Sequence, residues 1–329
     1  MVDLSVLDQL QKLSREIREL DVGHEVPKIH VGDLNSLTFY RDYVSRNKPV
    51  IITGALEGWP AVDRWNRASL ELALGSSQVS MAVTPDGRAD AVKQMSDGQR
   101  VFALPATERR PFPDFLEAVI KPEPGAIVYA QSQNNSMAEE FPQLMPDISE
   151  LEWATEAFGA PPEATNLWIG GDESVTSFHK DHYENIYAMV CGVKVFSLLP
   201  PADAYRLGIR PYSVAQYTRD QHGRLKLDLV NPKQEVPWSP VKSPADWQSS
   251  RPDPWNDGLP RPIVARVGPG EVLYLPSLWF HSVAQRSAQP GEPVIAVNFW
   301  YDMAFDCKAA YAKFCEELAT VALPALPSS

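Results

Sequence analysis

The sequence predicts a mainly β protein of the sandwich or jelly-roll class with flanking helices, and three observations support this. Eight short segments between residues 167 and 301 are rich in β-branched and aromatic residues and are bounded by Gly, Pro, Asp or Asn. The 30 prolines favour turns and strand ends over long helices. With 44% hydrophobic and 10% aromatic residues, the 329-residue chain can bury a substantial core.

The first 165 residues alternate between helical and strand patterns. Residues 4–20 place Leu or Ile at steps of three and four, which predicts an amphipathic helix. The segment 84–87 has Pro85 and Gly87 where a β-turn favours them. Further helices are expected after Phe39, at 113–120 and at 151–158, and strands at 48–53, 79–83 and 126–130.

The second half of the chain contains the eight strands and a final helix. The strands are expected at 167–170, 174–179, 183–191, 194–199, 263–267, 271–275, 281–285 and 294–301. Residues 205–260 are rich in Pro, Asp and Trp without a sustained period, so we expect them to form a lid or rim of a site. A helix from 306 to about 323 precedes a frayed tail, 323–329. The apolar stripes of the first and last helices pack either on their own domain or on a partner subunit, and we expect a homodimer through them.

Charge and cysteine content restrict the class of partner. The chain has 30 basic and 42 acidic residues, a net charge of −12, which argues against nucleic acid. Such a surface suits a basic protein or peptide, or serves solubility alone. Three Cys without zinc-ligand pairing make a disulfide scaffold improbable. With no stretch of about 18 apolar residues, we expect a soluble cytoplasmic or nuclear protein without a membrane partner.

The segment 176–185 and a distant Trp-Phe-His sequence carry the chemistry. In a strand, side chains two residues apart share a face, so His179 and Asp181 can bind one metal ion, with His281 as third ligand. Two imidazoles and one carboxylate with open coordination positions form the facial triad of non-haem Fe(II) oxygenases. His182, three residues from His179, would be a ligand only in a helix. The remaining histidines, His24, His30 and His222, are interpreted as surface or hydrogen-bonded residues.

Longer phrases place this motif in a family. They are Thr84-Pro85-Asp86-Gly87 followed by Ala89-Asp90-Ala91-Val92, then 179–185, 273–276 with 279–281, and 296–303. From Phe39 to Tyr311 the chain resembles the JmjC-type 2-oxoglutarate oxygenases, in their small cupin-like hydroxylase branch. The resemblance implies a double-stranded β-helix, the cupin-like jelly roll. Residues 1–125 would support it, 126–303 would form its core with the insert 205–260, and 304–329 would form the C-terminal helix and tail.

The resemblance also implies roles for individual residues. Fe(II) would be held by His179, Asp181 and His281, with 2-oxoglutarate and dioxygen as cosubstrates. Strand alternation turns Thr176 away from His179, so its role requires a β-bulge. The 2-oxoglutarate set would be Lys194, Thr176, Tyr129, Asn185 and Asn298, and the substrate pocket would include Tyr187 and Trp300. Without the resemblance, the non-functional interpretation is the stronger one for each: Lys194 as a surface lysine, Tyr129 as a core aromatic and Asn298 as a strand-end residue.

The activity implied by the resemblance is (3S)-hydroxylation of a lysine in a protein substrate, a translation-associated GTPase, coupled to conversion of 2-oxoglutarate to succinate and carbon dioxide. Histone-lysine demethylation uses the same iron and cosubstrate but ranks lower, because the chain has no reader domain or zinc-finger cysteines. Peptidase activity is a minor alternative without a visible nucleophile. A noncatalytic, metal-binding cupin-like scaffold is the alternative from a different class, and the triad together with Lys194 argues against it.

Overall fold

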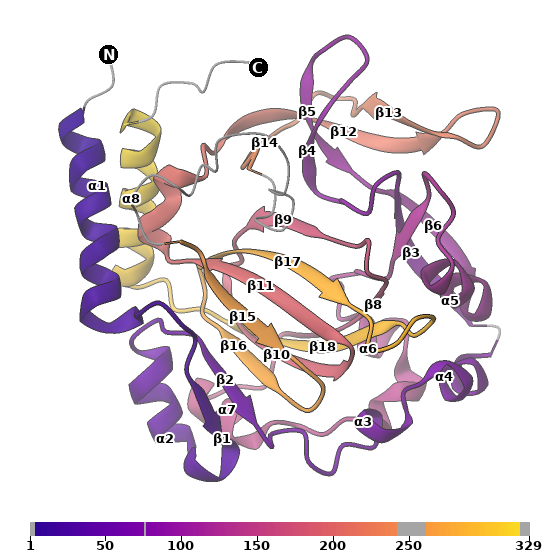
Figure 1. Cartoon of the computed structure of the whole chain (residues 1–329), viewed down its shortest axis with the longest axis horizontal. Helices are drawn as coiled ribbons and strands as arrows, with labels where there is room; N and C mark the ends of the chain where they lie inside the picture. The colour runs from indigo at the N-terminus through magenta and orange to yellow at the C-terminus, as the bar shows by residue number, and fades with distance from the viewer. Residues whose placement is uncertain (1–3, 76, 242–260, 323–329) are drawn as a thin grey trace.

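The computed structural model describes residues 4–75, 77–241 and 261–322, and two sheets form its centre, antiparallel except for the parallel pair β1–β2 (Figure 1). The larger sheet has the strand order β1-β2-β16-β10-β18-β8, and the smaller has the order β15-β11-β17-β9. This arrangement confirms the mainly β, jelly-roll fold. In the order just given, the strands span Lys28–His30, Val50–Thr53, Val272–Leu275, Tyr183–Cys191, Val294–Asp302 and Ala164–Gly170, then Ile263–Val267, Val193–Leu199, Phe280–Arg286 and Thr176–His179.

The two sheets differ in how much of each strand is buried. Every residue of β18 except Asp302 is buried, which explains why this strand reads as a nearly continuous apolar run. In contrast, β15 alternates between buried and exposed residues because one face of the smaller sheet meets solvent. Pairing of β10 with β18 places Asn185 opposite Trp300 and Tyr187 opposite Asn298. The register therefore brings four polar or amphipathic side chains to one face of the larger sheet.

The N-terminal region packs against the outer face of the larger sheet and is continuous with it. Strand β2 pairs with β16, and Phe39 contacts Tyr274 edge to face with 5.0 Å between ring centroids. The expected boundary at residue 125 is therefore bridged by both hydrogen bonds and core packing. The region also contains α2 (Ser36–Phe39), α3 (Pro60–Arg64), α4 (Arg67–Leu74), α5 (Phe112–Ile120), β3 (Gln78–Thr84) and β6 (Ala106–Pro111). Beyond residue 125, β7 (Ile127–Tyr129) completes a sheet of order β6-β3-β7, and α6 (Ser136–Glu139) and α7 (Glu152–Phe158) follow.

The insert after β11 is more regular than its sequence indicates. Its strands β12 (Arg210–Arg219), β13 (Leu225–Leu229) and β14 (Glu235–Trp238) join β4 (Ala91–Gln94) and β5 (Arg100–Leu104) from the N-terminal region. The sequence showed no sustained period over 210–238 because Pro211 and Pro237 lie within the paired strands β12 and β14, and because one partner of β12, β5, lies more than 100 residues away. Residues 242–260 of the expected lid lie outside the described residues.

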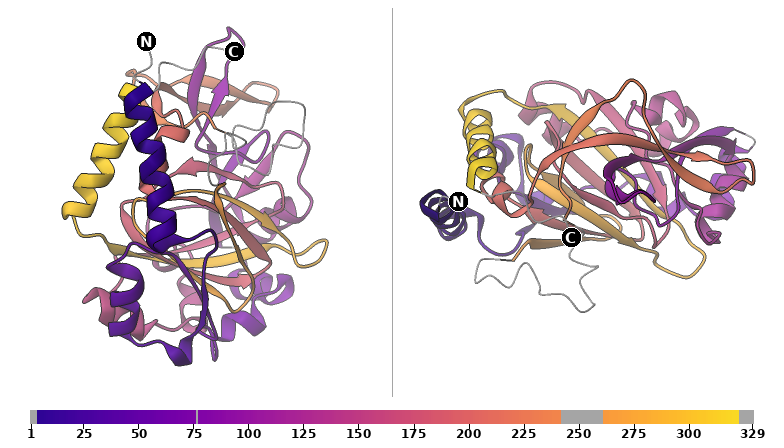
Figure 2. Two further views of the ribbon diagram at one scale, coloured as in Figure 1. Left: turned by 60° about the vertical axis from the view of Figure 1, so that its left-hand side comes forward. Right: turned by 90° about the horizontal axis from the view of Figure 1, so that it is seen from above.

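The terminal helices lie side by side along one edge of the molecule (Figures 1 and 2). Helix α1 (Leu4–Ile17) continues into a π-helical turn, Arg18–Val22, and packs with α8 (Cys307–Ala322) on the 3-10 helix η5 (Pro201–Arg206). A buried ion pair of 2.7 Å joins Arg18 to Asp203. Each terminal helix thus packs on its own chain. Among the described residues no helix is long and apolar enough to span a membrane, and the expected tail 323–329 lies outside them.

Candidate functional site

The three expected metal ligands meet at one end of the smaller sheet. His179 ends β9, and His281 lies directly opposite it as the second residue of β17. The ligand atoms of His179, Asp181 and His281 all lie within 4.8 Å of one another. Asp181 follows the strand instead of belonging to it, and the Leu278 backbone N–H fixes its position by donating to the Asp181 carbonyl at 2.9 Å. The three residues therefore form one cluster, although strand alternation alone does not account for Asp181.

Backbone carbonyls orient both imidazoles for a metal ion. His179 Nδ1 lies 2.9 Å from the Ser177 carbonyl, and His281 Nδ1 lies 3.0 Å from the Trp279 carbonyl. An imidazole that donates from Nδ1 leaves the Nε2 lone pair free for a metal. Burial, and then the neighbouring His179, lowers the pKa of His281 to about 4, which keeps this imidazole neutral at pH 7. The donor set and its protonation state thus fit a divalent metal such as Fe(II).

Lys194 lies at the buried end of the same cavity and is 1% exposed. Its ammonium donates to Tyr129 Oη and Gln285 Oε1, both at 2.8 Å. Among the described residues no carboxylate pairs with it, and burial lowers the pKa of Lys194 to about 7. A buried ammonium with only neutral partners fits an anionic ligand, because an unpaired buried charge is costly. The far carboxylate of 2-oxoglutarate has that chemistry.

A β-bulge brings Thr176 to the cavity. On β17 the pairing advances two residues, from His281 to Val283, while on β9 it advances three, from His179 to Thr176. The extra residue reverses the alternation, so Thr176 and His179 line the same cavity. The bulge that the Thr176 assignment requires is therefore present. All ten expected site residues line this one cavity: Tyr129, Thr176, His179, Asp181, Asn185, Tyr187, Lys194, His281, Asn298 and Trp300.

A chain of side-chain hydrogen bonds fixes the wall formed by the larger sheet. Trp168 Nε1–H donates to Asn298 Oδ1 at 2.8 Å, and Asn298 Nδ2–H donates to Asn185 Oδ1 at 3.1 Å. The Trp300 ring stacks on Tyr183 with 4.8 Å between centroids, and its indole N–H is buried without a partner among the described residues. The wall is therefore rigid and presents one free donor to a ligand.

Sequence reasoning missed several residues of the site. Gln285 pairs across the strands with Lys194, a position that becomes visible only once the register of β11 and β17 is known. Trp238 of the insert stacks on His179 with 6.1 Å between centroids and donates from Nε1 to Ser177 Oγ at 3.0 Å. The insert, which we expected to form a rim of the site, thus contacts the metal cluster through Trp238. The cavity is also lined by Asp90, Gln131, Gln133 and Trp168.

Of the other histidines, His182 is exposed and lies outside the cluster, with its ring 6.5 Å from that of Phe305. His30 Nδ1 accepts a hydrogen bond from the Gly32 backbone N–H at 3.0 Å. Neither side chain approaches the cavity lining. The triad is accordingly built from two of the six histidines.

Comparison with known proteins places the chain in a family. A family model described as a cupin-like domain matches residues 36–307. The chain is 45% identical to lysine-specific demethylase JMJ32 of Arabidopsis thaliana, over 94% of this chain and 91% of that protein. The chain belongs to the cupin-like JmjC family. It is 39% identical to the human bifunctional peptidase and (3S)-lysyl hydroxylase JMJD7, over 95% of this chain and 96% of that protein. JmjC domain-containing protein E of Dictyostelium discoideum is 37% identical, over 94% and 93%.

Membership in the cupin-like JmjC family settles the class of enzyme. The cupin-like JmjC relatives are 2-oxoglutarate-dependent oxygenases, and the chain is an oxygenase of this class. Family members use Fe(II) and 2-oxoglutarate, and the His179–Asp181–His281 cluster and the Lys194 environment provide residues whose chemistry fits both. The expectation of a JmjC-type oxygenase is therefore confirmed.

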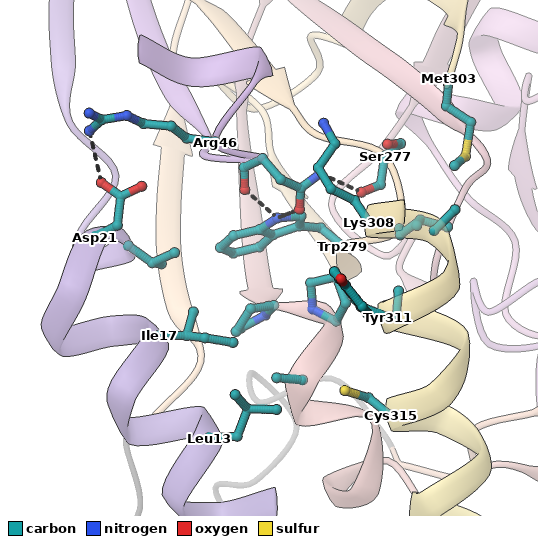
Figure 3. A pocket seen from close by; sticks show the side chains of 18 of the residues that line it. Leu13, Ile17, Asp21, Arg46, Ser277, Trp279, Met303, Lys308, Tyr311 and Cys315 are labelled. Atoms are coloured by element: carbon teal, nitrogen blue, oxygen red, sulfur yellow. Dashed lines mark hydrogen bonds and ion pairs between the residues drawn. The ribbon is translucent and has the colours of Figure 1, made fainter. Parts of the chain in front are cut away.

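A second hollow lies between α1 and α8 (Figure 3). Its volume is about 580 Å³ and its walls are mainly apolar, with Leu13 and Ile17 on one side and Tyr311 and Cys315 on the other. The Trp279 ring forms its floor and donates from Nε1 to the Asn47 carbonyl and Oδ1, at 2.9 and 2.7 Å. Because the Trp279 carbonyl also contacts His281, this groove and the metal cluster share one loop.

Proposed function

We propose that the chain is an Fe(II)- and 2-oxoglutarate-dependent protein lysyl hydroxylase that acts at C3 of a lysine in a translation-associated GTPase. The observation that carries this proposal is the combination, in one cavity, of the His-Asp-His cluster with the buried Lys194 ammonium. A metal-binding scaffold needs no buried cation beside its metal, whereas an enzyme with an anionic cosubstrate does. The 39% identity to a protein named as a (3S)-lysyl hydroxylase supports the reaction.

The residues divide into two sets by what they would hold. His179, Asp181 and His281 would hold the metal, and Lys194 with its neighbour Tyr129 would hold the far carboxylate of 2-oxoglutarate. When bound together, the metal and cosubstrate supply the activation of dioxygen for hydroxylation.

The protein itself orients the metal ligands and excludes water from the cavity. The carbonyls of Ser177 and Trp279 hold both imidazoles in the metal-binding tautomer, and the Trp168–Asn298–Asn185 chain fixes the opposite wall. The aromatic rings of the cavity exclude water from the reaction volume.

Lysine demethylation is the second candidate, because the chain is 45% identical to a protein named as a lysine-specific demethylase. The two reactions share the oxidising chemistry and differ in the carbon attacked. Attack on the C3–H bond, which is not attached to a nitrogen-bearing carbon of the side chain, leaves a stable alcohol, whereas attack on an N-methyl group leads to loss of formaldehyde. Mass spectrometry separates the two reactions. Hydroxylation adds about 16 Da to the substrate, the mass of one oxygen atom, whereas removal of one methyl group subtracts about 14 Da.

The deciding experiment incubates the protein with Fe(II), 2-oxoglutarate, air and a recombinant candidate GTPase. We expect succinate release together with one added oxygen on a lysine of the GTPase, and neither in the His179→Ala variant. Succinate release with demethylated product would establish the second candidate instead. Peptide fragments in the same spectra would establish a peptidase, and absence of both turnover and 2-oxoglutarate binding would leave the scaffold.

The expected partner chemistry and location remain part of this proposal. The net charge of −12 supports a basic segment around the target lysine. We infer a cytoplasmic location, extending to the nucleus, because Cys191, Cys307 and Cys315 are all free thiols. A fluorescent fusion found only in an oxidising compartment would contradict this location.

We further propose a homodimer through the terminal helices. Tyr311, Phe314 and Val321 of α8 are 68%, 58% and 65% exposed, although α8 also packs on its own chain. Tyr311 and Phe314 border the apolar groove described above. Burying such side chains against a second copy is favourable at about 25 cal/mol per Å² of apolar surface. Light scattering should give twice the mass of one chain, and Phe314→Glu should reduce it. A wild-type monomer at high concentration would refute the dimer.

A further inference from the structure

Asp90 lies beside the metal cluster in a conformation that its surroundings impose. It directly precedes β4, and its φ of +51° is in the left-handed region, which a residue other than Gly seldom adopts. The Ser177 hydroxyl donates to the Asp90 carbonyl at 2.6 Å, and Trp238 Nε1–H donates to that hydroxyl. The Asp90 backbone is thus held against β9 by Ser177, which is itself held by Trp238 of the insert. A strained residue held in this way at a ligand cavity suggests a function.

The half-buried Asp90 carboxylate lacks the partners that the fully buried carboxylates Asp203 and Glu184 have. Asp203 pairs with Arg18, and Glu184 accepts hydrogen bonds from Tyr274 Oη and from the backbone N–H and hydroxyl of Ser277. Asp90 accepts one long bond of 3.3 Å, from Gln131 Nε2–H, and within the described ranges no Lys or Arg pairs with it. Burial raises the pKa of Asp90, and the neighbouring His179 and the hydrogen bond from Gln131 oppose this shift.

We propose that Asp90 binds the ε-ammonium group of the substrate lysine. This assignment rests on the proposed lysyl hydroxylase function and names the residue that selects its substrate. Asp90 lines the same cavity as the metal ligands, on the shallow side with Gln131 and the exposed Gln133, while Lys194 lies at the buried end. The cavity therefore offers a cation to the cosubstrate at one end and a carboxylate to the substrate at the other.

The alternative role, orientation of a metal ligand, does not fit the contacts. His179 Nδ1 faces the Ser177 carbonyl, and no hydrogen bond joins the Asp90 carboxylate to His179.

The Asp90 carboxylate also selects between unmethylated and methylated lysine. An unmethylated ammonium has three N–H donors for Asp90 and Gln131, whereas a trimethylated one has none and is bound by aromatic cages. Asp90 thus favours unmethylated lysine, the substrate of a hydroxylase.

The test measures binding to protein loaded with Zn(II), which has no redox chemistry, and 2-oxoglutarate. The probes are two peptides that differ only in Lys or norleucine at one position, together with n-butylammonium. We expect the wild type to bind the Lys peptide at least tenfold more tightly, and D90N to lower this preference below about twofold. The matched control D86N removes a half-exposed carboxylate of the same loop, which pairs with Lys93 outside the cavity, and should keep the full preference.

The outcomes separate this assignment from the proposed function. Binding of n-butylammonium that D90N abolishes supports the site even if no lysine of any GTPase is hydroxylated, a result that would reject the function alone. Lysine hydroxylation by D90N with wild-type KM would overturn the Asp90 assignment and leave the function intact. Two other results would also overturn it: an unchanged Lys preference in D90N, or an equal loss of 2-oxoglutarate affinity and peptide affinity. Equal wild-type affinity for trimethyllysine and lysine peptides would overturn the selectivity.

Discussion

Replacing Lys194 with methionine tests whether the buried ammonium exists for a ligand. Methionine fills a similar volume without a charge, so Lys194→Met removes the anion-binding group and the electrostatic penalty together. We expect this variant to lose 2-oxoglutarate binding and to change the pH dependence of folding. The second effect is diagnostic, because it measures the charge itself and not the shape of the side chain.

The size of the effect follows from the pKa of Lys194, which burial lowers from 10.5 to about 7. At 1.36 kcal/mol per pKa unit, the charged side chain lowers the ligand-free unfolding free energy by about 5 kcal/mol below pH 7. Because the unfolded chain binds the proton more tightly, wild-type stability rises with pH, and the penalty falls to about 2 kcal/mol at pH 9. Leaving Tyr129 Oη and Gln285 Oε1 without their donor costs about 1–3 kcal/mol each, at every pH.

Urea unfolding of the ligand-free proteins at pH 6 and pH 9 measures the effect. The unfolding free energy of the variant minus that of the wild type should be about 3 kcal/mol larger at pH 6 than at pH 9. The surface variant Lys121→Met, whose side chain is 73% exposed, should show no such change. With Mn(II) present, 2-oxoglutarate at 100 times its Kd should stabilise the wild type by about 2.7 kcal/mol and leave Lys194→Met unaffected. A difference between variant and wild type that is equal at both pH values would refute the reasoning.

Three further predictions concern the metal and its supports. Asp181→Ala should weaken Mn(II) binding by at least about 100-fold, as measured by electron paramagnetic resonance, and unchanged affinity would remove Asp181 from the ligand set. Asn298→Ala leaves Trp168 Nε1–H without its acceptor, so urea unfolding should show a loss of about 1–3 kcal/mol, whereas a neutral effect would mean that water replaces the amide. Asn47→Ala removes one of the two acceptors of Trp279 Nε1–H, the Oδ1 atom, keeps the backbone carbonyl, and should weaken Mn(II) binding roughly threefold; a change in stability alone would contradict a positioning role.

Local patterns in the sequence were sufficient for most of the fold. The strand predicted at 183–191 coincides with β10, and the one at 263–267 coincides with β15, because both have β-branched or aromatic runs and clear turn residues at their ends. Strands β4 and β5, which pair with each other locally, were not predicted. Strand β12 escaped prediction because one of its partners, β5, lies more than 100 residues away. A propensity pattern contains no information about such distant partners.

The site residues whose role follows from residue type could be predicted from the sequence. Those whose role depends on strand register or on a β-bulge could not. Two imidazoles and a carboxylate indicate a metal wherever they meet, so the triad could be proposed without coordinates. The place of Thr176 depends on one extra residue in β9, and the role of Gln285 depends on strand register. Asp90 gave no signal of its own, since its significance lies in the cationic partner that it lacks.

The loop 276–281 makes the metal cluster and the helix groove parts of one system. The Leu278 backbone N–H holds Asp181, and the Trp279 carbonyl holds His281, so this loop positions two of the three ligands. The same Trp279 presents its ring to the groove between α1 and α8. Leu278, the preceding residue, has a φ of +68°, a strained backbone conformation that persists only where the surrounding structure holds it. Any molecule that binds the groove and moves Trp279 therefore alters metal affinity. By linkage, metal binding must alter the affinity of the groove for that molecule by the same factor.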